Sequence, residues 1–223
     1  MDKSSSCSPA RPSGSPARGR PKDANKRQGI MAAASQLFLN RGFHGTSMDA
    51  LAEAAGVSKA TVYSHFTDKN ALYQALIQSK VSNYQLDDLS PYLGWDMNDD
   101  LTMIGRNILD LIFDPEALEM LRMVICEGQQ VPALADLFRT AGPQVVFQQV
   151  ADYFAEQKRR GVDYLGNPEE DCGLHSGLLV EHRMMMQVLI GGQAIPDADK
   201  RQVLAQASAR RFIAVKKSEA STA

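Results

Sequence analysis

The sequence predicts an all-α fold, with a three-helix N-terminal head followed by a larger helical-bundle body. From about residue 25 onward, apolar residues recur at the spacing of an amphipathic helix. No part of the body alternates apolar and polar residues as a half-buried strand would. Prolines that start helices and glycines that end them divide the body into segments of helix length. The 223 residues allow one or two domains with a substantial core.

The first helix of the head is expected over residues 25–41, with Gly42 as a C-terminal signal. Its apolar residues share one face and should point inward. They are Ile30, Ala33, Ala34, Leu37 and Phe38.

A short helix, a glycine turn and a second short helix follow over residues 42–66. Ser47 and Ser58 can each cap one of these helices. Gly56 lies between them, where steeply crossing helices need a residue that tolerates positive φ. On the second helix, Val62 and Phe66 form the inward stripe at i and i+4.

The remaining residues of the second helix carry hydroxyls, a cation and a phenol, which suit phosphates and base edges. They include Ser58, Lys59, Thr61, Tyr63, Ser64 and His65. The pattern predicts a helix-turn-helix that places this helix in the DNA major groove. A solvated helical hairpin is the alternative on the pattern alone.

With its flanks, the segment resembles the TetR family of transcriptional repressors over about residues 25–75. The match is carried by Ile30, Ala33, Ala34, Leu37, Phe38, Arg41, Gly42, Phe43, Thr46, Ser47, Met48, Leu51, Ala52, Ala55, Gly56, Val57, Ser58, Val62, Tyr63, Ser64, His65, Phe66, Lys69 and Leu72. Ala60 departs from the glycine of many members, which blurs the base that it would approach. On this resemblance the chain is a DNA-binding regulator and not an enzyme.

The resemblance assigns the expected DNA contacts. The residues expected to contact phosphate are Thr46, Tyr63, His65 and Lys69. The residues expected to face bases are Lys59, Ala60 and Thr61. Ser47 and Ser58 are also expected to contact DNA. It further implies a homodimer on a palindromic operator, released by an unknown small-molecule effector. A DNA-binding structural protein of the same fold without an effector is the alternative. The residues expected at the dimer interface are Leu178, Leu179, Met185, Val188, Leu189, Val203, Leu204, Ala207, Phe212 and Ile213.

Charge is divided between head and body. Residues 1–70 hold ten Lys and Arg against five Asp and Glu, whereas the remainder holds 14 against 21. A basic head on an acidic body suits a protein whose head alone meets a polyanion.

Residues 1–24 are rich in Ser, Pro, Gly, Ala and cations, and are expected to form a disordered basic arm. Within the arm, Arg18-Gly19-Arg20-Pro21 resembles an AT-hook core, so Arg18 and Arg20 could enter an A·T minor groove. The alternative, which the sequence supports equally well, is a flexible basic tail that is attracted to the DNA phosphates without entering a groove.

The N-terminus is polar, and no apolar run reaches the length of a membrane span. Cys7, Cys126 and Cys172 lack paired spacing and suit a reducing compartment, so we expect a cytoplasmic protein that does not enter a membrane.

The head is expected to end at residue 70, and the regulatory and dimerisation domain to cover residues 71–216. Asp68 can cap a helix over about residues 69–85, and later helices are expected over about 98–112, 114–127, 132–140, 143–160, 167–190 and 197–215. Residues 217–223 are expected to be a disordered tail. The stretch 122–143, with the long helix after it, is similar to an AefR-like regulatory domain.

Thioether and aromatic side chains of the body could line an adaptable apolar pocket, with a few charged or polar residues to hold a ligand group. The candidates are Trp95, Met103, Phe113, Met120, Arg122, Met123, Glu127 and His175. Ordinary core packing is the alternative for the apolar ones. Asp171, His175 and His182 share a helical face, but their spacing is poor for a metal, so neither metal nor cofactor is expected.

Overall fold

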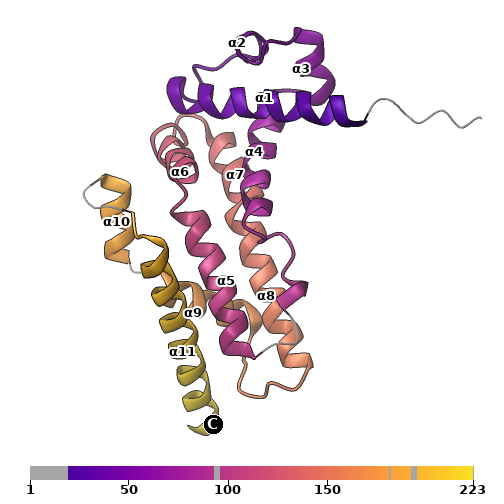
Figure 1. Cartoon of the computed structure of the whole chain (residues 1–223). Coiled ribbons are helices and arrows are strands. Elements are labelled where there is room, and N and C mark those ends of the chain that lie inside the picture. The colour runs from indigo at the N-terminus through magenta and orange to yellow at the C-terminus, as the bar shows by residue number, and fades with distance from the viewer. Residues whose placement is uncertain (1–19, 93–95, 181, 192–194, 223) are drawn as a thin grey trace, which may run out of the picture.

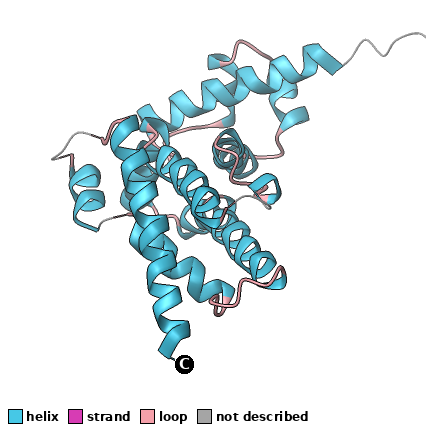
Figure 2. Ribbon diagram, turned by 60° about the horizontal axis from the view of Figure 1, so that its bottom comes forward, coloured by secondary structure: helices cyan, strands magenta, loops and turns pink. Residues whose placement is uncertain are grey.

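The computed structural model describes residues 20–92, 96–180, 182–191 and 195–222, and these residues form helices and loops without a strand (Figure 2). The predicted all-α class is confirmed. The helices are α1 (Arg20–Arg41), α2 (Met48–Ala54), α3 (Lys59–His65), α4 (Lys69–Asn83), the 3-10 helix η1 (Ser90–Tyr92), α5 (Met97–Ile112), α6 (Pro115–Glu127), α7 (Pro132–Ala141), α8 (Pro143–Arg159), α9 (Pro168–Leu179), α10 (His182–Ile190) and α11 (Ala198–Thr222).

The helices form a head and a body. Figure 1 shows α1, α2 and α3 at one end of the molecule, with α4 running from them into the bundle. In the body, α11 packs along α5, and α8 packs against α7 and α9. Within the described residues no helix is both long and apolar enough to cross a lipid bilayer.

Two hydrophobic clusters hold this arrangement together. The head cluster includes Ile30, Phe38, Leu51, Val62 and Phe66, and it extends to Met120, Met123 and Leu134 of the body. The body cluster is built mainly from α5, α8, α9 and α11. Helix α4 contributes Leu72, Tyr73, Leu76 and Ile77 to the head cluster and Val81 to the body cluster.

Three boundaries differ from the sequence-based expectations. Helix α1 begins at Arg20, five residues earlier than expected, because Asp23 favours the first turn and proline is tolerated there. Arg20 is therefore helical and not part of the extended Arg-Gly-Arg of an AT-hook. Arg18 lies outside the described residues.

The helix expected over 167–190 is two helices, α9 and α10. Val180 ends α9 in an extended conformation, with φ −113° and ψ 110°, which suits a β-branched residue. Helix α11 continues to Thr222, so residues 217–222 are helical and not the disordered tail expected. Lys216 joins this last part to the body through ion pairs with Glu219, at 2.7 Å, and Asp171, at 3.0 Å.

His175 is a buried polar residue within the body cluster. Its ring packs edge-on against Phe154 and Phe212, and within the described part of the chain neither ring nitrogen has a hydrogen-bond partner. Burial lowers the pKa of His175 from 6.5 to about 4. The folded state therefore binds the proton more weakly than the unfolded state does, and stability is lost as the pH falls from about 6.5 toward 4.

We predict that His175→Phe, which cannot titrate, removes part of the acid destabilisation. Between pH 7 and pH 5 the variant should lose about 2 kcal/mol less unfolding free energy than the wild type. Urea denaturation at the two pH values measures this difference. His44→Gln, which removes an exposed histidine in the head, is the control variant. An unchanged acid sensitivity in His175→Phe would contradict this assignment.

Candidate functional site

The helix-turn-helix forms as the sequence predicts. The Ser47 and Ser58 hydroxyls accept hydrogen bonds from the backbone N–H groups of Ala50, at 3.2 Å, and Thr61, at 3.1 Å. Both residues therefore cap their helices, α2 and α3. Gly56 has φ +65°, the conformation that the turn requires. These contacts fix the angle at which α3 leaves α2.

The outward face of α3 presents the residues expected to meet DNA. Tyr63 is 52% exposed, although it is a large aromatic residue. Lys59 and Ala60 are exposed, and Lys59 Nζ forms an ion pair with Asp49 Oδ2 at 2.6 Å. Thr61 is half-buried, with its hydroxyl 2.9 Å from that of Ser58. A phosphate can compete with Asp49 for Lys59, because this ion pair is solvent-exposed and such pairs are weak.

The side chain of Thr46 is not placed for the phosphate contact expected of it. It is only 2% exposed, and its hydroxyl donates to the backbone oxygens of Gly42, at 2.8 Å, and Leu37, at 3.3 Å. The side chain thus ties the end of α1 to the following loop. Its role in the structure is to hold the start of α2 in place.

Lys69 and His65 also point their polar atoms at the protein. Lys69 Nζ donates to the backbone oxygens of Phe43, at 2.7 Å, and Thr46, at 3.1 Å, and lies 4.4 Å from the centre of the Phe43 ring. Burial lowers its pKa, against the opposing charge of Glu127. His65 is 10% exposed, with Nε2 3.3 Å from Asp23 Oδ1. The structure therefore gives both side chains positioning roles within the head.

Glu127, at the end of α6, connects the body to the head. Its carboxylate accepts hydrogen bonds from the backbone N–H groups of Phe43, at 3.2 Å, and His44, at 3.0 Å. Gly42 precedes them with φ +73°, and a Cβ there would lie 2.1 Å from Glu127 Oε1. The positive φ favours glycine at this position, and a side chain there would displace the Glu127 carboxylate from its contact with the loop. The expectation that Glu127 holds a ligand in the body is corrected.

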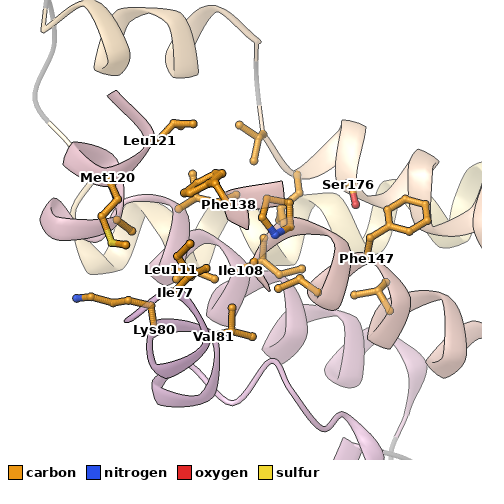
Figure 3. A pocket seen from close by; sticks show the side chains of 18 of the residues that line it. Ile77, Lys80, Val81, Ile108, Leu111, Met120, Leu121, Phe138, Phe147 and Ser176 are labelled. Carbon is orange, nitrogen blue, oxygen red and sulfur yellow. The ribbon is translucent and has the colours of Figure 1, made fainter. Parts of the chain in front are cut away.

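A cavity of about 400 Å³ lies in the body (Figure 3). Its walls come from α4 through α10, and they include Ile77, Ile108, Met120, Phe138, Val150 and Leu179. Because Ile77 and Met120 belong to the head cluster and Ile108, Val150 and Leu179 to the body cluster, the cavity lies where the two clusters meet. A volume of this size is within the range of small-molecule sites.

Of the residues expected to line a pocket, Met120 alone lies in this wall among the described residues. Met103 is 43% exposed, Phe113 and His175 are core residues of the body cluster, and Met123 belongs to the head cluster. Trp95 lies outside the described residues.

Arg122 holds α10 and does not line the cavity. Its guanidinium donates to the backbone oxygens of Val188, at 2.7 Å, and Leu189, at 3.3 Å, and pairs with Glu119. The sequence reasoning missed the wall itself, because its residues are mostly aliphatic and look like ordinary core along each helix.

No group of three metal-binding side chains lies close enough together to hold an ion among the residues that the structure describes. Asp171 accepts from the backbone N–H of Gly166, at 2.9 Å, and pairs with Lys216. His175 is enclosed by aromatic rings, and the side chain of His182 lies outside the described residues.

These positions predict different effects for two substitutions in the head. Thr46→Val keeps the shape and removes two hydrogen bonds, so it should lower the unfolding free energy by about 1–3 kcal/mol. It should leave the salt dependence of duplex DNA binding unchanged. Lys59→Ala should reduce the slope of log affinity against log salt by about one, because one phosphate contact is lost. A reduced slope in Thr46→Val would restore the phosphate role for Thr46.

Comparisons with known proteins agree with this geometry. The family model for bacterial regulatory proteins of the tetR family matches residues 30–76, which contain the helix-turn-helix. The model for the C-terminal domain of AefR-like transcriptional repressors matches residues 99–215, which contain most of the body.

Similar curated proteins are named as transcriptional regulators. YvkB of Bacillus subtilis, an HTH-type transcriptional regulator, is 30% identical over 171 residues, which are 77% of this chain and 81% of YvkB. The HTH-type transcriptional activator FasR of Mycolicibacterium smegmatis is 43% identical over 74 residues. That match covers only 33% of this chain and 34% of FasR.

Solved structures share the whole arrangement. A TetR-family transcriptional regulator from Mesorhizobium loti has a TM-score of 0.72 at 27% identity, with 87% of this chain and 98% of that chain covered. The flavonoid-responsive regulator FrrA has a TM-score of 0.67 at 29% identity, with 86% and 97% covered. The chain therefore belongs to the TetR family of bacterial transcriptional regulators.

Proposed function

We propose that this DNA-binding regulator is a dimeric repressor that binds a palindromic operator and is released by a small molecule in the body cavity. The observation that carries the proposal is that the cavity is lined by α4 and α6, both of which also contact the head. The alternative, a DNA-binding structural protein of the same fold, gives this cavity no role.

On the DNA side, the exposed face of α3 supplies the proposed contacts. Tyr63 binds phosphate, as expected. Lys59 is assigned to phosphate in place of the base contact expected of it, because its ammonium forms only a solvent-exposed ion pair for which phosphate can compete. Ala60 and Thr61 face bases, and the capped N-termini of α2 and α3, at Ser47 and Ser58, lie beside them. Hydroxyl groups such as that of Thr61 can bond to several base edges. Thr61 therefore contributes to base preference, whereas Tyr63 and Lys59 strengthen binding to any sequence.

The apolar residues that α10 and α11 expose support the proposed dimer. Ile190 is 77% exposed, Val203 60% and Met186 43%. Exposed apolar groups of this kind mark interaction surfaces when they gather, and most soluble oligomers are twofold. Leu179, Val188 and Phe212, which the sequence placed in the interface, are instead buried in the core of the single chain.

Dimerisation matters because one head makes too few contacts for tight, specific binding. Two heads set one or more DNA turns apart double the contacts and read a palindrome. A ligand that favours one spacing of the heads over another then changes operator affinity, whereas a ligand that binds both forms equally changes nothing.

A small-molecule effector is supported by the likeness to FrrA, which is described as flavonoid-responsive. FasR is described as an activator, but its likeness covers only 33% of this chain, so we do not carry that role over to this protein. We place the protein in the cytoplasm, where a regulator of this family reaches DNA.

Selection of duplexes from random DNA with the full chain tests the operator proposal. We expect an inverted repeat, and we expect Val203→Asp to give a monomer that binds it about a hundredfold more weakly, because only one head is held on the site. Val203→Thr, which keeps the shape without a charge, is the matched control and should remain dimeric by sedimentation. Selection of a single half-site, or tight binding by monomeric Val203→Asp, would contradict the proposal.

A further inference from the structure

The cavity wall is apolar almost throughout. Among its described residues, Lys80 and Ser176 are the ones with polar side chains, and the others are aliphatic, aromatic, thioether, proline or glycine residues. An apolar site of this kind binds mainly by removing hydrocarbon surface from water. The chemistry of a ligand's polar group is therefore set by what Lys80 and Ser176 offer.

The charge of Lys80 is already neutralised by the protein. Its Nζ lies 3.0 Å from Asp114 Oδ1 and 2.8 Å from Glu116 Oε2. Burial by itself lowers the pKa of Lys80, but the hydrogen bonds and charges of Glu116 and Asp114 outweigh burial, so the pKa is raised and the ammonium stays protonated. One cation thus faces two carboxylates, and the group carries a net negative charge.

Lys80 lies at the edge of the cavity. Figure 3 shows its nitrogen pointing away from the apolar side chains, so the aliphatic stem forms the wall. Asp114 is held where it is, because it also accepts from Tyr84 Oη, at 2.9 Å, and from the backbone N–H of Ala117, at 2.8 Å. The carboxylate that neutralises Lys80 is therefore held in place by hydrogen bonds in addition to its ion pair.

An anionic ligand would lose its hydration on entering this site and find no unpaired cation, while the excess carboxylate would repel it. An uncharged ligand has no ionic hydration to lose and is not repelled by the carboxylates. A single hydroxyl group on such a ligand can donate to Ser176 Oγ at the wall.

We infer that the cavity selects uncharged, mainly apolar small molecules and rejects carboxylates of the same carbon skeleton. This inference rests on the proposed function, in which the cavity is the effector site. The cavity volume of about 400 Å³ lies near the lower end of ligand-site volumes, so the ligand is small.

Calorimetric titration of the full chain with 1-decanol and with decanoate, at a pH where decanoate is ionised, tests the inference. The two probes share a ten-carbon chain and differ in the charge of the head group. We expect decanol to bind about tenfold or more tightly than decanoate, because only decanoate must be desolvated as an ion. Decanoate binding as tightly as decanol would overturn the inference and leave the cavity as an effector site.

The double variant Asp114→Asn with Glu116→Gln releases the ammonium of Lys80, and asparagine preserves the N-cap of α6. It should raise decanoate affinity by about tenfold and leave decanol affinity unchanged, since only the anion gains a partner. Unchanged decanoate affinity in this variant would also overturn the inference. Val146→Trp, which fills the cavity, should abolish decanol binding and so locate the site.

Failure of the proposed function gives a different result. In that case neither probe binds the wild type, and decanol does not alter operator affinity. The inference about ligand charge then falls together with the effector role of the cavity.

Discussion

Helix α4 is packed into two hydrophobic cores at once, and the relation between head and body depends on this. Leu72 and Tyr73 are fully buried near its start, within the head cluster, while Val81 is buried near its end, within the body cluster. Because well-packed cores tolerate little displacement, a movement of the body end of α4 must be passed to the head. The cavity touches this helix at Ile77, Lys80 and Val81, where one cluster gives way to the other.

A second connection between body and head consists of a few hydrogen bonds to one loop. The Glu127 carboxylate holds the backbone of Phe43 and His44, and Lys69 holds the same loop from the other side through the carbonyls of Phe43 and Thr46. Since Met120 and Leu121 of α6 line the cavity, the helix that carries Glu127 runs from the cavity wall to the head. Two helices that line one cavity thus both contact the loop that leads into α2.

The sequence predicted the features that local chemistry decides. The caps at Ser47, Ser58 and Asp68 and the turn at Gly56 are confirmed, because each depends on residues within a few positions. The inward directions of Thr46 and Lys69 could not be predicted, since they follow from how α1, α4 and the loop pack together. The contact of Glu127 with Phe43 joins residues 84 positions apart, and the cavity is assembled from many helices, so neither leaves a local signal.

Amide hydrogen exchange of Phe43 and His44, with and without decanol, tests the central claim most directly, because these N–H groups report the Glu127 contact itself. If cavity and head are coupled through α6, saturating decanol changes the exchange of both amides. Glu127→Ala should then show fast exchange that no longer responds to decanol. Decanol that binds and weakens operator affinity, with unchanged exchange at both amides in the wild type, would contradict this route.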